Sequence, residues 1–87
     1  MRTSYNHESL DRHGISKEEV DESYATGKDF DLPSSANGND RIMVVGWTAS
    51  GRLLEIGIEY WTNGDEYIFH AMDATRYYSE LFSKDKR

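Results

Sequence analysis

The chain has no cysteine, a single proline and no long hydrophobic run among its 87 residues. Because cysteine is absent, the chain forms neither disulfides nor thiolate metal sites, and we expect a cytoplasmic protein in a reducing environment. No segment approaches the roughly 20 apolar residues that span a bilayer. No charged and then apolar N-terminal stretch predicts a signal peptide, so we expect no membrane partner.

Basic residues are also in short supply. The chain has 10 Lys and Arg against 16 Asp and Glu, and its net charge is −6. Proteins that bind nucleic acids are usually basic, because phosphate neutralisation supplies much of their affinity. The acidic residues gather in 16–40, with a net charge of −5, whereas 74–87 carry +2. The sequence therefore allows a small RNA-facing patch near its C-terminus, and an acidic region that could bind a basic partner or a second copy in a homodimer.

The chain has enough hydrophobic residues to form one small core. Hydrophobic residues make up 37% of the chain, so residues 1–87 are expected to form a single domain. Two short helices are expected first. One spans 5–14 with Asn6 as its cap, and the other spans 15–27 with Ser16 as its cap.

After these helices the sequence pattern changes. Residues 28–40 contain Pro33 and several small polar residues, and are expected to be a flexible loop. β-Branched and aromatic residues then predict an antiparallel three-stranded meander, with strands at 41–48, 52–61 and 66–74. A last helix is expected from Thr75 onward. This order of elements indicates an α+β fold with helices packed on one face of the sheet.

Alternation along the strands predicts one apolar and one mixed face of the sheet. The apolar face of the middle strand carries Leu54, Ile56 and Ile58. The mixed face, which could host a site, carries Glu55, Gly57 and Glu59. The same alternation in the last strand places His70 on one face with Ile68 and Met72.

Three motifs follow one another in a recognisable order. They are "HGIS" at 13–16 with "EEV" after it, the hairpin "RIMVVGWTASGRLL" at 41–54, and "AMDATR" at 71–76. This ordered set resembles the BrnT family of toxins from bacterial toxin–antitoxin pairs, and the resemblance covers most of residues 5–82. The family usually begins with an extra strand that contains an aromatic–acidic pair, whereas only "MRTSY" precedes the first expected helix here.

The resemblance implies a fold similar to that of RelE-type ribonucleases and an RNA-cleaving activity that arrests translation. It also implies a cognate antitoxin protein as partner. The expected function is therefore a metal-free endoribonuclease, or a decayed derivative of one, that an antitoxin neutralises. The alternative is a non-catalytic protein–protein interaction module on the same scaffold, which the acidic balance favours.

RNA cleavage without a metal requires a base, an acid and a cation that stabilises the charged phosphorane. His70 is the candidate for proton transfer, because imidazole exchanges protons near neutral pH. Its alternative is a partly buried strand histidine bonded to the backbone. Arg76 matches the family's threonine–arginine step and could hold the phosphate, or it could simply pair with Glu80. Arg52 also matches the family, although its simpler role is that of a charge that prevents an exposed strand from pairing with another chain.

Four further residues are candidates for binding RNA. Arg12 and His13 lie at the end of the first helix, where the helix dipole favours cations whatever the function. Trp47 and Tyr77 could stack on bases, or could be core or antitoxin-contact residues. The three histidines have no metal-like spacing, and no glycine-rich phosphate loop occurs, so we expect no metal and no cofactor.

Overall fold

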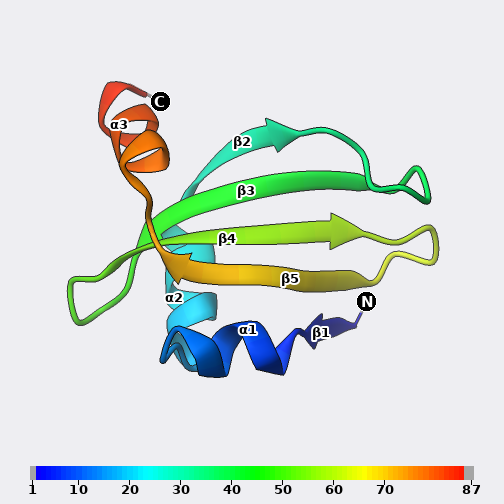
Figure 1. The fold of residues 1–87 in the computed structure, drawn as a ribbon, viewed down its shortest axis with the longest axis horizontal. Coiled ribbons are helices and arrows are strands. Elements are labelled where there is room, and N and C mark those ends of the chain that lie inside the picture. Colours follow the sequence, from blue (N-terminus) through cyan, green and yellow to red (C-terminus); the bar gives the residue numbers. More distant parts are fainter. Residues whose placement is uncertain (1, 86–87) are drawn as a thin grey trace.

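The computed structural model describes residues 2–85, which fold into one five-stranded sheet and three helices. The elements in chain order are β1 (Thr3–Tyr5), α1 (His7–Arg12), α2 (Lys17–Thr26), β2 (Lys28–Leu32), β3 (Asp40–Trp47), β4 (Leu53–Tyr60), β5 (Glu66–Asp73) and α3 (Arg76–Lys84). The strand order is β1-β5-β4-β3-β2, with β1 parallel to β5 and all other neighbours antiparallel (Figure 1). The expected α+β class is confirmed.

The expected three-stranded sheet is corrected to five strands. β3, β4 and β5 form the antiparallel meander, and β1 and β2 extend it at its two edges. β1 has only three residues, and it is a strand because it pairs with β5, where Thr3 lies opposite Glu66. β2 occupies the first five residues of the segment that was expected to be a loop, and it pairs with β3 around Phe30. Its two aspartates are uncommon in strands, so the sequence did not predict it.

Helix starts follow the expected capping chemistry. Asn6 Oδ1 accepts from the Ser9 amide at 3.3 Å, and Ser16 and Glu19 form a reciprocal capping box. Thr75 begins α3 in the same way, since its hydroxyl accepts from the Tyr78 amide at 3.5 Å. These caps fix where each helix leaves the sheet.

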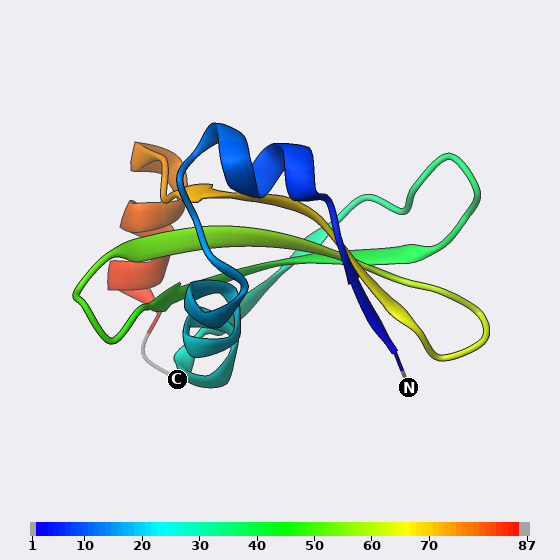
Figure 2. The same ribbon diagram turned by 90° about the horizontal axis from the view of Figure 1, so that it is seen from below.

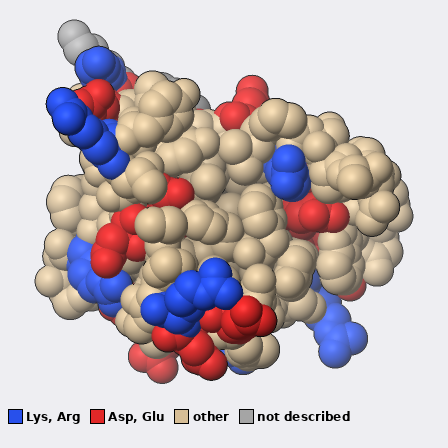
Figure 3. Space-filling view, in the orientation of Figure 1, with Lys and Arg blue, Asp and Glu red and all other residues tan. Residues whose placement is uncertain are grey.

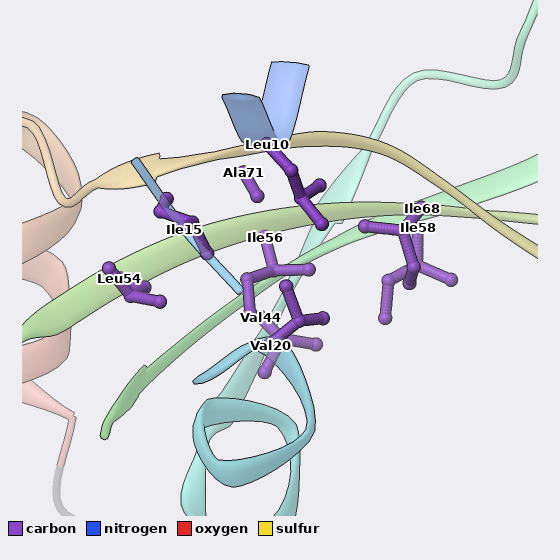
Figure 4. Packing of buried hydrophobic residues seen from close by; sticks show 9 residues of the cluster. All are labelled: Leu10, Ile15, Val20, Val44, Leu54, Ile56, Ile58, Ile68 and Ala71. Carbon is purple, nitrogen blue, oxygen red and sulfur yellow. The ribbon is translucent and has the colours of Figure 1, made fainter. Parts of the chain in front are cut away.

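The core lies between the sheet and the pair α1 and α2. α1 packs on β5, and α2 packs on β3 and β4, as the view from below shows (Figure 2). The buried apolar side chains of this layer are Leu10, Ile15, Val20, Val44, Leu54, Ile56, Ile58, Ile68 and Ala71 (Figure 4). The predicted apolar face of the middle strand is therefore the core face. Within residues 2–85, no helix has the length and apolarity needed to cross a membrane.

The opposite side of the sheet, which we call the open face, carries the side chains of Glu55, Glu59, Tyr67 and His70. The expectation that all helices pack on one face of the sheet is wrong, because α3 lies on this face and covers one corner of it, where its rings pack edgewise or tilted against Phe30 and Trp47. No described residue of α3 is fully buried. In Figure 1 the sheet lies in front of α2, and the same orientation in Figure 3 shows wide uncharged areas between scattered charged side chains.

Candidate functional site

A buried carboxylate organises the corner of the open face beside α3. Glu55 comes from β4 and is only 4% exposed. Its Oε2 lies 2.9 Å from Nε2 of His70 on β5, and its Oε1 accepts from the Thr75 amide at 2.7 Å. A buried carboxylate is costly unless its oxygens are hydrogen-bonded, and these two donors supply that need. Glu55 thereby joins two strands and the start of the last helix.

His70 reaches the open face because β5 contains an irregularity. Gly57 pairs with His70 and Ile58 pairs with Ile68, so Phe69 is an extra residue in β5. The expectation that His70 shares a face with Ile68 is therefore wrong, because a bulge shifts the alternation by one residue. The Phe69 ring lies directly over Gly57, where an added Cβ would meet it at 2.6 Å.

The Glu55 contact fixes the orientation of the imidazole. An ionised carboxylate only accepts, so Nε2 of His70 carries the proton in this contact. Nδ1 then bears the lone pair, and it has no hydrogen-bond partner within residues 2–85. The His70 side chain is 29% exposed, which leaves the ring accessible. This arrangement can accept a proton at Nδ1 while Glu55 stabilises the resulting imidazolium.

Two tyrosines of α3 extend the same corner. Burial raises the pKa of Tyr78, and the neighbouring Tyr77 and the Glu55 carboxylate raise it further. The two tyrosine rings meet edge to face with centroids 5.0 Å apart. Tyr77 is 65% exposed, so the ring expected to stack on bases is accessible to a ligand.

Arg76 lies next to this corner in the chain but points into solvent. It directly follows Thr75, whose amide is bonded to Glu55. Its side chain is 92% exposed, and its Nε donates to Glu80 at 3.0 Å, which is the simple pairing weighed as the alternative. Exposed pairs of this kind contribute little and break easily, so the guanidinium is available to a ligand. Lys86 and Arg87, which contribute to the basic C-terminal patch, lie outside the described residues.

Arg52 is not brought together with His70. Its guanidinium donates to the carbonyls of His13 and Gly14, and it pairs with Glu19 at 3.2 Å and Asp73 at 3.1 Å. These contacts place it against the connection between α1 and α2, on the side opposite the open face. The hydrogen bond that Arg52 donates to Asp73, together with the negative charges of Asp73 and Glu19, raises the pKa of Arg52. Arg52 therefore ties the helices to the β3–β4 hairpin.

The remaining sequence candidates are dispersed. Arg12 pairs with Glu8 one turn earlier at 2.8 Å. His13 ends α1 and bonds through its backbone, whereas Trp47 is 49% exposed and packs edgewise on Phe82 near α3. The structure thus brings His70, Arg76 and Tyr77 to one corner and places Arg12 and His13 on the other side of the sheet.

Glu55 is the site residue that the sequence candidates omit. A signal for it existed, since the alternation of β4 places an acid in the middle of an otherwise apolar run. Its partners could not be inferred, because they depend on the bulge in β5 and on the direction of α3. Within residues 2–85, no group of three or more His, Asp or Glu side chains could hold a metal ion.

Comparisons with known proteins identify no relative: no protein-family model and no curated protein matches the chain. Fold alone does not determine function. Function is therefore inferred from the chemistry of the open face together with the order of the family-like motifs.

Proposed function

We propose that the chain is a BrnT-like toxin of a toxin–antitoxin pair, and that it cleaves RNA at the corner of the open face beside α3. The observation that carries this proposal is the position of His70, oriented by the buried carboxylate of Glu55 at 2.9 Å. A histidine held in this way on an accessible surface is suited to removing a proton from a hydroxyl group. The 2′-hydroxyl of RNA is the substrate group that such a base would activate. Its oxygen attacks the adjacent phosphorus, the bond from phosphorus to the 5′-oxygen breaks, and water supplies the proton for that leaving oxygen.

The start of α3 supplies the positive end of the site. Arg76 is exposed and adjacent to Thr75, and the amides of a helix's first turn attract anions. We assign the phosphate contact to Arg76 alone, since the contacts of Arg52 lie on the opposite side of the sheet. Tyr77, exposed one residue later, is placed to contact a neighbouring base.

The family-like motifs support the same proposal. The three-residue strand β1 precedes α1, and the BrnT family usually has an extra strand ahead of its first helix, although β1 lacks that strand's aromatic–acidic pair. The partner expected on this basis is an antitoxin protein. The open face, whose middle α3 leaves uncovered, is the surface on which we place it.

Growth arrest tests this proposal most simply. Expression of the chain alone is expected to stop growth, and His70→Gln and Arg76→Ala are each expected to relieve the arrest. His7→Gln is the matched control, because His7 begins α1 and is exposed. Normal growth with abundant wild-type protein would contradict the toxic function.

A second candidate function is a non-catalytic protein–protein interaction module on the same scaffold. The observation favouring it is that Arg12, Arg52 and Arg76 are each paired with a carboxylate. A phosphate would have to compete with these carboxylates for each of the three guanidinium groups. A pull-down with a single stoichiometric partner, combined with intact RNA after incubation with the purified chain, would select this function.

A further inference from the structure

A second hollow lies at the end of the sheet away from α3. It encloses about 460 Å³ between the loop that joins β2 to β3 and the turn that joins β4 to β5. Figure 1 shows these two connections at the same end of the sheet, and Figure 2 shows that their tips diverge, so the hollow is open between them. The hollow is lined by Asn37, Asn39, Glu59, Trp61, Asn63 and Tyr67. Its size lies within the roughly 300–1,000 Å³ of sites that hold small ligands or single ligand groups.

One wall of the hollow is a pair of stacked rings. Trp61 and Tyr67 lie with centroids 5.7 Å apart and ring planes inclined by 28°. Trp61 is 38% exposed, although indole is a large apolar group. An exposed indole backed by a second ring is a preformed platform for another flat ring, because its orientation is already fixed before a ligand binds.

The polar wall presents hydrogen-bond acceptors. Glu59 Oε2 accepts from Nδ2 of Asn39 at 2.8 Å. Within residues 2–85, this leaves Oε1 of Glu59 and Oδ1 of Asn39 without a donor. Asn63 does not contribute in the same way, since its side chain donates to Asp65 and accepts from the Asp65 amide. The hollow therefore requires a ligand with neighbouring N–H donors, and its carboxylate disfavours an anionic group.

A flat ring with two neighbouring donors describes a particular nucleobase. Guanine carries N1–H and its amino group side by side on one edge, and the two free oxygens, Oε1 of Glu59 and Oδ1 of Asn39, are acceptors for such a pair of donors. Uracil has only one donor on that edge, and adenine presents an acceptor beside its amino group. The stacked rings and the Glu59 carboxylate thus match guanine better than the other three bases.

We propose that this hollow is a subsite that recognises a guanine base of single-stranded RNA. The inference rests on the proposed function, because Glu59 and the catalytic corner share the open face. Glu55 and Glu59 are four residues apart on β4, which corresponds to about 13 Å along the strand. Between them, the Arg41 guanidinium lies 5.4 Å from the centre of the Phe69 ring and offers a second flat surface.

The charge of the chain agrees with recognition through bases. With a net charge of −6, the protein gains little from phosphate neutralisation, so stacking and contacts to base edges have to supply its affinity. Binding is therefore expected to depend only weakly on salt. A basic RNA-binding protein shows the opposite behaviour.

Tryptophan fluorescence provides a direct test, because the chain has two tryptophans and Trp47→Phe leaves Trp61 as the sole reporter. The variant is titrated with the pentanucleotides UUGUU, UUAUU and UUUUU. Saturable quenching is expected with UUGUU at a dissociation constant about tenfold lower than with the other two. The added substitution Glu59→Gln, which keeps an oxygen for Asn39, is expected to abolish this preference.

Adding His70→Gln makes failure of this inference distinguishable from failure of the proposed function. Guanine-selective quenching that survives His70→Gln, without RNA cleavage by the wild-type chain, supports the subsite and overturns the catalytic proposal. Cleavage of RNA by the wild-type chain with equal quenching by all three pentanucleotides, or with none, overturns the subsite and leaves the catalytic proposal standing. A preference for guanine that persists in Glu59→Gln also overturns the subsite, because the base would then be recognised elsewhere.

Discussion

Nε2 of His70 lies 2.9 Å from Oε2 of Glu55, across the neighbouring strands β5 and β4. The contact is diagonal, since Glu55 pairs in register with Met72 and His70 pairs with Gly57. Gly57 has no side chain, so the Phe69 ring can lie over it, and the bulge at Phe69 turns His70 toward the open face. The site therefore depends on an irregularity in the sheet as much as on its two titratable groups.

Loss of the Glu55 carboxylate is expected to destabilise the fold. Glu55→Ala leaves the Thr75 amide and the His70 ring without their acceptor, which costs about 1–3 kcal/mol in free energy of unfolding. Urea unfolding of the purified variant measures this loss. Glu80→Ala, in an exposed pair on α3, is the control and should change the free energy of unfolding by no more than about 0.5 kcal/mol. Equal stability of the two variants would contradict the role given to Glu55.

Substitutions of Arg52 and Arg76, the two arginines of the family-like motifs, are expected to have different effects: one on stability and the other on RNA cleavage. Arg52→Ala removes contacts that hold the α1–α2 connection, so we expect a loss of about 1–2 kcal/mol and unchanged cleavage per folded molecule. Arg76→Ala should leave stability almost unchanged and reduce cleavage, since its side chain is 92% exposed. Unfolding curves and cleavage assays on both variants test this separation. If Arg52→Ala lost cleavage activity while remaining fully stable, the structural role given to Arg52 would be contradicted.

A methyl group at Gly57 is expected to disturb the bulge. Gly57→Ala brings a Cβ to 2.6 Å from the Phe69 ring, and such overpacking costs about 1–3 kcal/mol. The double variant Gly57→Ala, Phe69→Leu should recover part of this loss, because the ring that collides is gone. A double-mutant cycle from urea unfolding gives the coupling energy between the two positions. A coupling energy of zero would show that the ring does not limit the size of residue 57.

Acid is expected to weaken the start of α2. The Ser16 amide and the Arg52 guanidinium lower the pKa of Glu19 from its ordinary 4.5. A carboxyl group with a lowered pKa in the folded state stabilises the fold above its unfolded pKa, and this contribution disappears as the pH falls below about 4.5. Urea unfolding between pH 3 and pH 7 should show less pH dependence in Glu19→Gln than in the wild-type chain. Glu18→Gln, one residue earlier in the same helix turn, is the control and should retain the wild-type slope.

The sequence predicts some of this architecture and fails in identifiable places. Helix starts at Asn6, Ser16 and Thr75 are local, since each cap bonds the amide three residues on, and sequence spacing is enough to place them. β1 and β2 are not local. The three residues of β1 pair with a segment more than 60 positions away in the chain. β2 contains two aspartates, so its sequence is typical of a loop, and it forms a strand by pairing with β3.

In the candidate site too, the sequence predicted the local features and missed those that depend on contacts between distant segments. Strand alternation correctly predicted a mixed face with Glu55 and Glu59, but it placed His70 with Ile68 because a bulge has no clear mark in one sequence. Arg52 matches the family-like hairpin, yet its partners come from the α1–α2 connection, α2 and β5, and only the folded structure shows that they contact it.

His70, oriented by Glu55, is proposed to cleave RNA without a metal. The most direct measurement is incubation of the purified chain with end-labelled single-stranded RNA in excess EDTA, with wild-type, His70→Gln and His7→Gln proteins side by side. We predict that the wild-type chain and His7→Gln yield fragments ending in 2′,3′-cyclic phosphate, and that His70→Gln is at least about a hundredfold slower. Intact RNA with the wild-type chain, or equal cleavage by His70→Gln, would contradict the claim.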